Sequence, residues 1–149
     1  MPDFTIRRAS RNDLEAMTLV DPKLASEPKR ADHVLPLLDL GLSWLAEGEG
    51  EAQGRALGYV LASTRFFDRP FVDLLVVADD ARRLGVGTAL MAACEDQHDD
   101  DRLFTSTNES NAPMRALLAK AGYRVSGVIE NLDPGDPELV FVKFRPVEL

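Results

Sequence analysis

The residues best suited to chemistry are two arginines and two glycines that follow a predicted strand ending at Val77. The stretch Arg82-Arg83-Leu84-Gly85-Val86-Gly87-Thr88 leads into a predicted helix. The first amides of a helix lack partners within it and carry partial positive charge. Because glycine has no Cβ, a phosphate can approach such a backbone closely. The stretch therefore predicts a pyrophosphate site; the alternative is that its glycines only shape the turn.

Two common phosphate loops do not match this stretch. A dinucleotide fingerprint has the form Gly-x-Gly-x-x-Gly in an early strand–helix turn, and its third glycine would fall at Leu90. A P-loop requires Gly-Lys followed by Ser or Thr, a combination that the chain lacks. The pattern instead indicates a pyrophosphate held by backbone amides beside arginine charge.

Hydrophobic spacing predicts the elements that position this stretch. Apolar residues at helical intervals begin at Val86 and again at Met114, and Gly122 ends the second of these helices. The order β-α-α-β-β-β-α-β-α-β-β indicates an α/β fold, a mixed sheet with helices packed on it, in one domain over 1–149. Two further helices are predicted at 10–19 and 31–40, and strands at 4–6, 43–47, 57–64, 71–77, 103–107, 123–130 and 139–144.

Length and composition restrict the function classes. The chain has 149 residues and one cysteine, Cys94, so we expect neither an intrachain disulfide nor a cysteine-based metal site. Its 17 basic and 25 acidic residues give a net charge of −8, which disfavours nucleic-acid binding. Apolar runs such as Leu74–Ala78 are much shorter than the about 20 residues that span a membrane. We expect a cytoplasmic protein with no metal, nucleic-acid or membrane partner.

Three segments resemble the GNAT acetyltransferases. Arg82-x-x-Gly85-x-Gly87 is similar to the family's acetyl-CoA loop, Gln/Arg-x-x-Gly-x-Gly/Ala. Asn111 opens a predicted helix that ends in Lys120-x-Gly122-Tyr123, which looks like the family's second conserved segment. The strand Gly58–Leu61 resembles its third strand. The predicted order of elements fits the GNAT fold, whose fourth and fifth strands splay apart, over nearly the whole chain.

The resemblance implies that the chain binds acetyl-CoA. The pyrophosphate would lie on the amides of 83–88, and the pantetheine arm would pair with 75–77 as an extra strand. Asn111 would contact the pantetheine or a phosphate, serve as a helix cap, or do both. Lys120 would reach a CoA phosphate or stay solvated. The expected cofactor residues are Leu75, Val76, Val77, Arg82, Arg83, Leu84, Gly85, Val86, Gly87, Thr88, Asn111 and Lys120.

The chemistry implied by the resemblance is direct attack of an amine on the acetyl thioester, between the strands at 71–77 and 103–107. The amine must be neutral to attack, so a carboxylate takes its proton. Asp73 is the candidate base, and alternation places it on the face of Phe71 and Leu75 unless a bulge intervenes. The alternative is a solvated or salt-bridged Asp73. A backbone N–H near Val77 would stabilise the oxyanion.

Leu118 departs from the family pattern. The family often has a tyrosine at this position as the acid that protonates the leaving thiolate. Either another group serves, or the thiolate leaves unprotonated, which a thiol pKa near 8.5 permits. Tyr123 and Cys94 are interpreted as core residues.

Acidic residues surround the last predicted hairpin, and Glu130 and Asp133 are its candidate substrate contacts. Asp136 and Glu138 belong to the same group. These carboxylates would attract a cationic amine, but turn formation and solubility explain them equally well.

The sequence therefore predicts an acetyl-CoA-dependent N-acetyltransferase that acts on a primary amine of a small molecule or peptide, as a homodimer. The first alternative is a non-catalytic acyl-CoA-binding or sensor domain of the same fold, which Leu118 favours. The second is a toxin-like enzyme that acetylates charged tRNA, which the net charge of −8 disfavours.

Overall fold

Seven strands form one mixed sheet in the computed structural model, which describes residues 3–145. The spatial order is β1-β2-β3-β4-β5-β7-β6, and only β4 and β5 run parallel. The predicted α/β architecture is confirmed. The strands are β1 (Phe4–Arg8), β2 (Trp44–Gly48), β3 (Ala56–Phe66), β4 (Arg69–Val77), β5 (Arg102–Asn108), β6 (Arg124–Ile129) and β7 (Glu138–Phe144).

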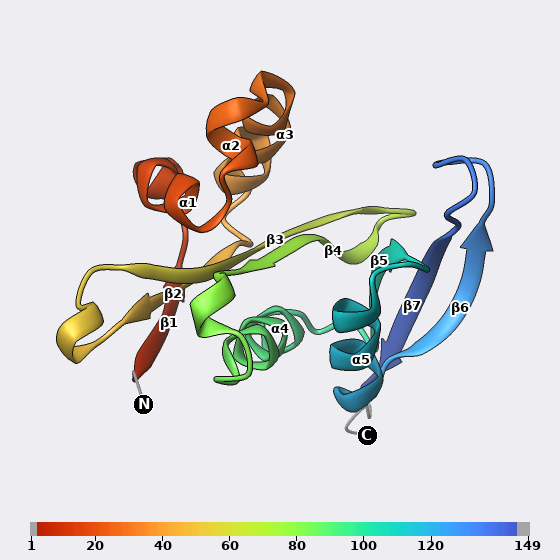
Figure 1. The fold of residues 1–149 in the computed structure, drawn as a ribbon. Coiled ribbons are helices and arrows are strands. Elements are labelled where there is room, and N and C mark those ends of the chain that lie inside the picture. Colours follow the sequence, from red (N-terminus) through yellow and green to blue (C-terminus); the bar gives the residue numbers. More distant parts are fainter. Residues whose placement is uncertain (1–2, 146–149) are drawn as a thin grey trace.

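Helices cover both faces of the sheet (Figure 1). Three helices lie over one face and two over the other. The first group holds one helix more than predicted, because residues 23–26, directly after Pro22, form a separate four-residue helix. The helices are α1 (Leu14–Val20), α2 (Lys23–Ser26) and α3 (Pro28–Asp39) on one face, and α4 (Val86–Asp96) and α5 (Ala112–Lys120) on the other; single 3-10 turns lie at Arg11–Asp13, Gly50–Ala52 and Asp79–Ala81.

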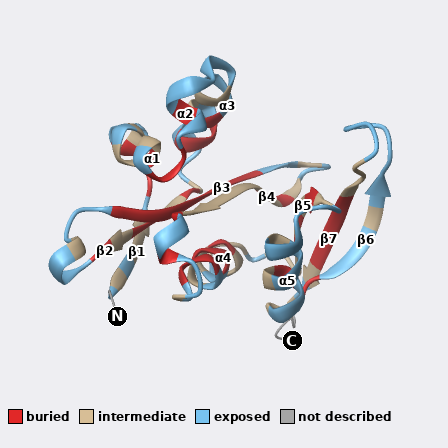
Figure 2. Ribbon diagram, in the orientation of Figure 1, coloured by how far each residue is buried: buried red, intermediate tan, exposed pale blue. Residues whose placement is uncertain are grey.

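The core lies between the sheet and these helices, and buried residues concentrate on β3, β7 and the inner side of α4 (Figure 2). Cys94 is fully buried in α4, and burial raises the pKa of its thiol to about 12. Tyr123 is also buried, with its hydroxyl donating to Glu95 Oε2 at 2.8 Å. Both residues are core residues, as predicted.

A buried polar group joins the α1–α3 side to the sheet. Tyr59 on β3 is fully buried and donates to Asp21 Oδ2 at 2.5 Å, and Arg30 Nε of α3 donates to the same oxygen at 2.7 Å. Asp21, directly after α1, thus receives hydrogen bonds from both layers. The pKa of Tyr59 is raised, first by burial and then by Asp21.

The strands β4 and β5 pair over only two positions before they diverge. Phe71 lies opposite Phe104 and Val72 opposite Thr105, and no later pair is formed. The register of β3 with β4 shifts at this level: Leu61 faces Leu74 and Ala62 faces Val72, so Asp73 is an extra residue in β4. This bulge bends β4 away from β5. The predicted splay of the fourth and fifth strands is therefore present, and it begins at Asp73.

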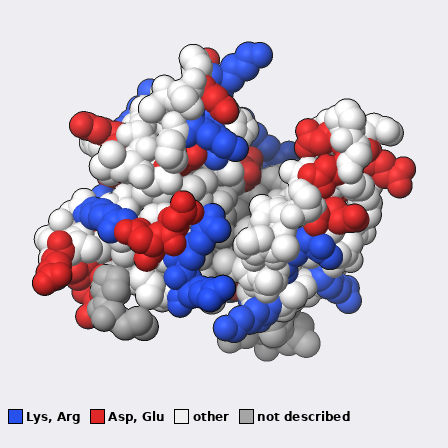
Figure 3. Space-filling model, viewed as in Figure 1, with Lys and Arg blue, Asp and Glu red and all other residues white. Residues whose placement is uncertain are grey.

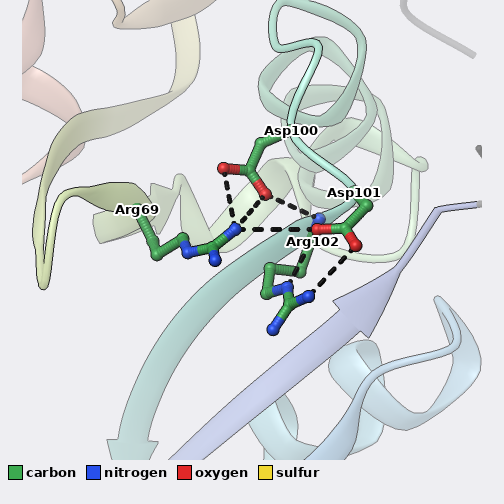
Figure 4. Close-up of polar contacts among 4 residues, drawn as sticks. All are labelled: Arg69, Asp100, Asp101 and Arg102. Atoms are coloured by element: carbon green, nitrogen blue, oxygen red, sulfur yellow. Dashed lines mark hydrogen bonds and ion pairs between the residues drawn. The ribbon is translucent and has the colours of Figure 1, made fainter.

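An ion cluster holds the paired end of β4 and β5 together (Figure 4). Arg69 Nη1, at the start of β4, lies 3.1 Å from Asp100 Oδ1 and 3.7 Å from Asp101 Oδ1, in the loop that precedes β5. Arg102 binds both oxygens of Asp101, at 2.9 and 3.0 Å. The Arg102 guanidinium lowers the pKa of Asp101 to about 2. The closed end of the gap is thus fixed by charged side chains from β4, β5 and the loop.

Candidate active site

A cavity of about 700 Å³ begins where β4 and β5 part, and it is bounded by β4, β5, α5 and the loop before α4. Figure 3 shows a hollow in the middle of this face of the molecule, with Lys and Arg side chains around its lower rim. Val76 and Leu84, expected among the cofactor residues, do not line it. The predicted residues that do are Asp73, Leu75, Val77, Arg82, Arg83, Gly85, Val86, Gly87, Thr88, Asn111 and Lys120.

The fold requires glycine at two positions of the loop for different structural reasons. Gly85 is the N-cap of α4 with φ +86°, a left-handed conformation that favours glycine, and a Cβ there would meet nothing within 4 Å. Gly87 has no Cβ because one would lie 2.6 Å from Leu117 Cδ1 of α5. Gly87 therefore allows α4 to pack closely against α5. Both glycines serve the local fold and also leave the backbone accessible at the helix N-terminus.

Positive charge borders this helix start. Arg83 has φ +69° and, within residues 3–145, forms no ion pair. Arg82 makes an exposed ion pair with Asp79 at 3.2 Å, and Lys120 lies at the far end of α5 on the same cavity. Free amides, a helix N-terminus and cationic side chains together form a site that suits a pyrophosphate.

The open edge of β4 offers main-chain groups to the cavity. The N–H of Ala78 donates to Leu57 O of β3 at 2.9 Å. Because peptide groups alternate along a strand, those of Val76 also face β3, whereas those of Leu75 and Val77 face the gap beside β5. Leu75 and Val77 present unpaired strand edges to which an extended ligand can add.

Asp73 lies on the face of Phe71 but not on that of Leu75, because the bulge intervenes. Leu75 pairs with Val60 and Phe71 with Ser63, two β3 positions on opposite faces. The Oδ1 atom of Asp73 is buried and has no hydrogen-bond partner among the described residues. The prediction was therefore right for Phe71 and wrong for Leu75. The register of β4 with β3 shows the difference.

The pKa of Asp73 is raised, because burial disfavours the carboxylate. The nearby Ser63 hydroxyl and the positive charges of His33 and Arg65 oppose this rise. Ser63 is fully buried, whereas His33 on α3 and Arg65 on β3 are exposed. A partly buried carboxyl with a raised pKa at the closed end of a cavity has the properties of a general base.

Helix α5 places Asn111 and Leu118 differently with respect to the cavity. Asn111 caps the helix, its Oδ1 accepting from Met114 N at 3.2 Å, and it also lines the cavity. The cap prediction is confirmed. Leu118 is fully buried and does not line the cavity. The position where a general acid was expected therefore carries an apolar side chain packed in the core.

The acidic hairpin lies outside the cavity. Asp133 accepts from Asn108 Nδ2 at 2.9 Å, and Asp136 accepts from the Ser110 hydroxyl at 2.6 Å. Glu130 is exposed, and neither Glu130 nor Asp133 lines the cavity. Acidic side chains gather over the β6–β7 connection in Figure 3. Hydrogen bonds to the end of β5 thus explain Asp133 and Asp136 structurally.

The sequence reasoning missed the polar side chains of β5. Thr105, Ser106 and Thr107 all line the cavity. The sequence did contain a signal, because Thr-Ser-Thr-Asn is unusually polar for a strand in the middle of a sheet.

Residues 3–145 contain no cluster of three potential metal ligands and no helix long and apolar enough to cross a membrane.

Comparisons with known proteins agree with this geometry. The acetyltransferase (GNAT) family model matches residues 13–123. A solved GNAT-family acetyltransferase from Bacillus cereus is 28% identical, with a TM-score of 0.84 over 97% of this chain and 99% of that one. An uncharacterized N-acetyltransferase from Methanocaldococcus jannaschii is 23% identical over 95% of this chain and 92% of its own. The ribosomal-protein-S18-alanine N-acetyltransferase of Escherichia coli shares the fold, with a TM-score of 0.74 at 17% identity over 99% of this chain and 96% of its own.

Proposed function

The chain belongs to the GNAT family of acetyltransferases, and from this premise we propose that it transfers the acetyl group of acetyl-CoA to a primary amine of a small molecule or peptide. The observation that carries the proposal is the cavity itself. It opens between two diverging parallel strands, has a helix N-terminus with arginine charge at one end, and has the partly buried carboxyl of Asp73 at the other.

The residues of the cavity fit acetyl-CoA along its length. The amides from Arg83 to Thr88 would hold the pyrophosphate, with Arg82 and Lys120 near the phosphates. The free edges of Leu75 and Val77 would bind the pantetheine arm as a strand would. This direction along β4 brings the thioester toward Asp73, where the strands part.

Two chain groups would carry the reaction. Asp73 would accept the proton that the amine loses as it attacks, and its raised pKa suits that role. A backbone N–H on the free edge of β4 would donate to the acyl oxygen as negative charge develops there. Val77 was the expected donor; Leu75 faces the same gap and is closer to Asp73 in β4, so we assign the donor to Leu75 and pantetheine contact to Val77.

The leaving thiolate needs no strong acid in this site. Leu118 cannot protonate it, and the ordinary pKa of a thiol near 8.5 allows departure as an anion. The same feature keeps a second candidate in consideration, a domain that binds acyl-CoA without turnover. The two candidates share the cofactor site and differ only in whether an amine is acetylated.

Thermal unfolding with acetyl-CoA, CoA and NAD in parallel tests the cofactor site. A ligand at 100 times its Kd adds about 2.7 kcal/mol, enough to raise Tm by several degrees. We expect a rise with acetyl-CoA and CoA and none with NAD. No rise with any of the three would refute the proposal. Release of CoA with a panel of primary amines then separates the enzyme from the binding domain.

Two substitutions at Gly85 locate the phosphate. Gly85→Asp places a carboxylate at the helix start, so we expect acetyl-CoA binding measured by calorimetry to disappear. Gly85→Ala is the matched control, because it carries the same left-handed strain without charge. It should retain most of the affinity. Equal affinities for the two variants would place the phosphate elsewhere.

The proposal extends to the location, the partners and the oligomeric state of the enzyme. The composition supports a cytoplasmic enzyme that acts as one domain and has no nucleic-acid or membrane partner. A homodimer is proposed because β6 is an edge strand with exposed Val125, Val128 and Ile129. Sedimentation of the purified chain tests this last point, and a monomer at micromolar concentration would contradict it.

A further inference from the structure

Asp73 and Ser106 are the first positions after the last paired residues of β4 and β5, and both line the cavity. The parallel register places Phe71 opposite Phe104 and Val72 opposite Thr105. The next positions along the two strands are Asp73 and Ser106. Both residues line the cavity at its closed end.

The two side chains also lie on the same face of the sheet. Phe104 packs against Phe66 and pairs with Phe71, on the face that also carries Ser63. Alternation places Ser106 on this face and Thr105 on the other. Thr105 is already satisfied, since its hydroxyl donates to Val72 O at 3.0 Å. Ser106 is therefore the first β5 hydroxyl that opens beside Asp73.

The two polar groups differ in what surrounds them. Asp73 Oδ1 is buried without a hydrogen-bond partner among the described residues, whereas Ser106 is half-buried and lines the cavity. Buried polar atoms are nearly always hydrogen-bonded, to protein, water or ligand. A buried carboxylate oxygen without a partner and a cavity-lining hydroxyl on the neighbouring strand can therefore bind the same small polar group.

We infer that Ser106 is a second substrate-contacting residue, which holds the attacking nitrogen between β4 and β5 together with Asp73. The inference rests on the proposed function. As the C–N bond forms and the C–S bond breaks, one amine proton passes to Asp73 and CoA leaves as its thiolate. Ser106 Oγ accepts the other N–H and so directs the nitrogen lone pair at the acyl carbon. In the free protein a water occupies the same place.

The titration of Asp73 tests the bridge without any knowledge of the acceptor. Carboxyl NMR would follow Asp73 in the full chain and in Ser106→Ala, with Ser126→Ala on exposed β6 as control. Loss of the bridging partner should raise the pKa of Asp73 by roughly half a unit to one unit. The other groups facing Asp73, namely Ser63, His33 and Arg65, are the same in all three proteins. An unchanged pKa in Ser106→Ala overturns the inference.

Kinetics with the best amine from the panel give the second test. Ser106→Ala should lower kcat/KM for the amine about tenfold and leave KM for acetyl-CoA unchanged. Ser106→Thr should restore most of the activity, because it keeps the hydroxyl. Combining Ser106→Ala with Asp73→Asn should cost less than the product of the two losses, since both act on one nitrogen. Wild-type kcat/KM in Ser106→Ala, or independent losses, would overturn it.

Failure of this inference is distinguishable from failure of the proposed function. If the wild-type chain neither binds acetyl-CoA nor acetylates any amine, the function fails, and the Asp73 titration still decides whether Ser106 shares a bridge with it. If acetyl-CoA binds and an amine is acetylated but both Ser106 tests are negative, only the Ser106 role fails. A Tm for Ser106→Ala equal to that of Ser126→Ala excludes a merely structural effect.

Discussion

Asp73 lies at the β4 bulge, and its Oδ1 is buried without a hydrogen-bond partner among the described residues. Burial raises its pKa, so the ionised base is lost as the pH falls through a value above the ordinary 3.8. We expect Asp73→Asn to lower kcat/KM by roughly 10²–10⁴ and to remove the acidic limb of the pH–rate profile. A variant that keeps the wild-type profile would show that another group is the base.

The same burial predicts the opposite effect on stability. Because folding raises the pKa of Asp73, the folded chain holds that proton more tightly than the unfolded chain. The resulting cost is absent below the unfolded pKa and present at neutral pH. Asp73→Asn should therefore raise Tm by roughly a few degrees at pH 7 and change it little at pH 3. A lower Tm at pH 7 would mean that the carboxylate is stabilised in the fold.

The structural positions of some site residues could be predicted from the sequence, and those of others could not. The Arg82–Gly87 loop was predictable, because its positive φ and its helix start are set by neighbouring residues in the chain. The face of Asp73 was not, because the bulge arises from the register with β3. Ser106 was missed for a related reason: its face and its opposite residue depend on which strand lies beside β5.

At the scale of elements, the Tyr59–Asp21–Arg30 group fixes α1 and α3 on β3. Tyr59→Phe removes one of the two donors to the buried Asp21 Oδ2. An acceptor left partly unsatisfied costs about 1–3 kcal/mol. We expect the free energy of unfolding of Tyr59→Phe, measured with urea, to be lower than that of the wild type by this amount. Acetyl-CoA affinity should be unchanged, because the cofactor loop lies on the other face; a parallel loss of affinity would show coupling between the two sides.

The ion cluster at the paired end of β4 and β5 is expected to control the splay. Arg69→Gln removes its contacts with Asp100 and Asp101 while leaving the Arg102 pair intact. Amide hydrogen exchange at Val72 and Thr105 should become faster, and the difference from wild type should shrink at 1 M salt, as it does for screened charges. Exchange unaffected by both the substitution and the salt would mean that strand pairing alone holds this end.

The order and type of most elements followed from periodicity, while their junctions did not. All seven strands and both helices of the cofactor side were predicted, and in both helices the prediction rests on a clear apolar repeat. Helix α2 has four residues, too few to show a period. The hydrogen bonds of Asp133 to Asn108 and of Asp136 to Ser110 could not be predicted, because no local pattern shows that the hairpin lies beside the end of β5.

For the whole molecule, the net charge of −8 decides between acceptor classes. A tRNA substrate requires a basic surface to neutralise its phosphates. We expect no measurable retention of tRNA on the immobilised chain at physiological salt, and no acetylation of aminoacyl-tRNA. The matched comparison is the same column at low salt. Retention that persists at physiological salt would return the tRNA-acetylating alternative to first place.

The buried Cys94 has a practical consequence for studies of this enzyme. Its thiol is fully enclosed in α4 and its pKa is raised to about 12, so almost no thiolate exists at neutral pH. It is the chain's one cysteine. In the folded protein Cys94 should therefore not react with maleimides, iodoacetamide or disulfide reagents. Every free thiol that such a reagent detects during turnover is then released coenzyme, so acetyl transfer can be counted continuously without a background from the enzyme.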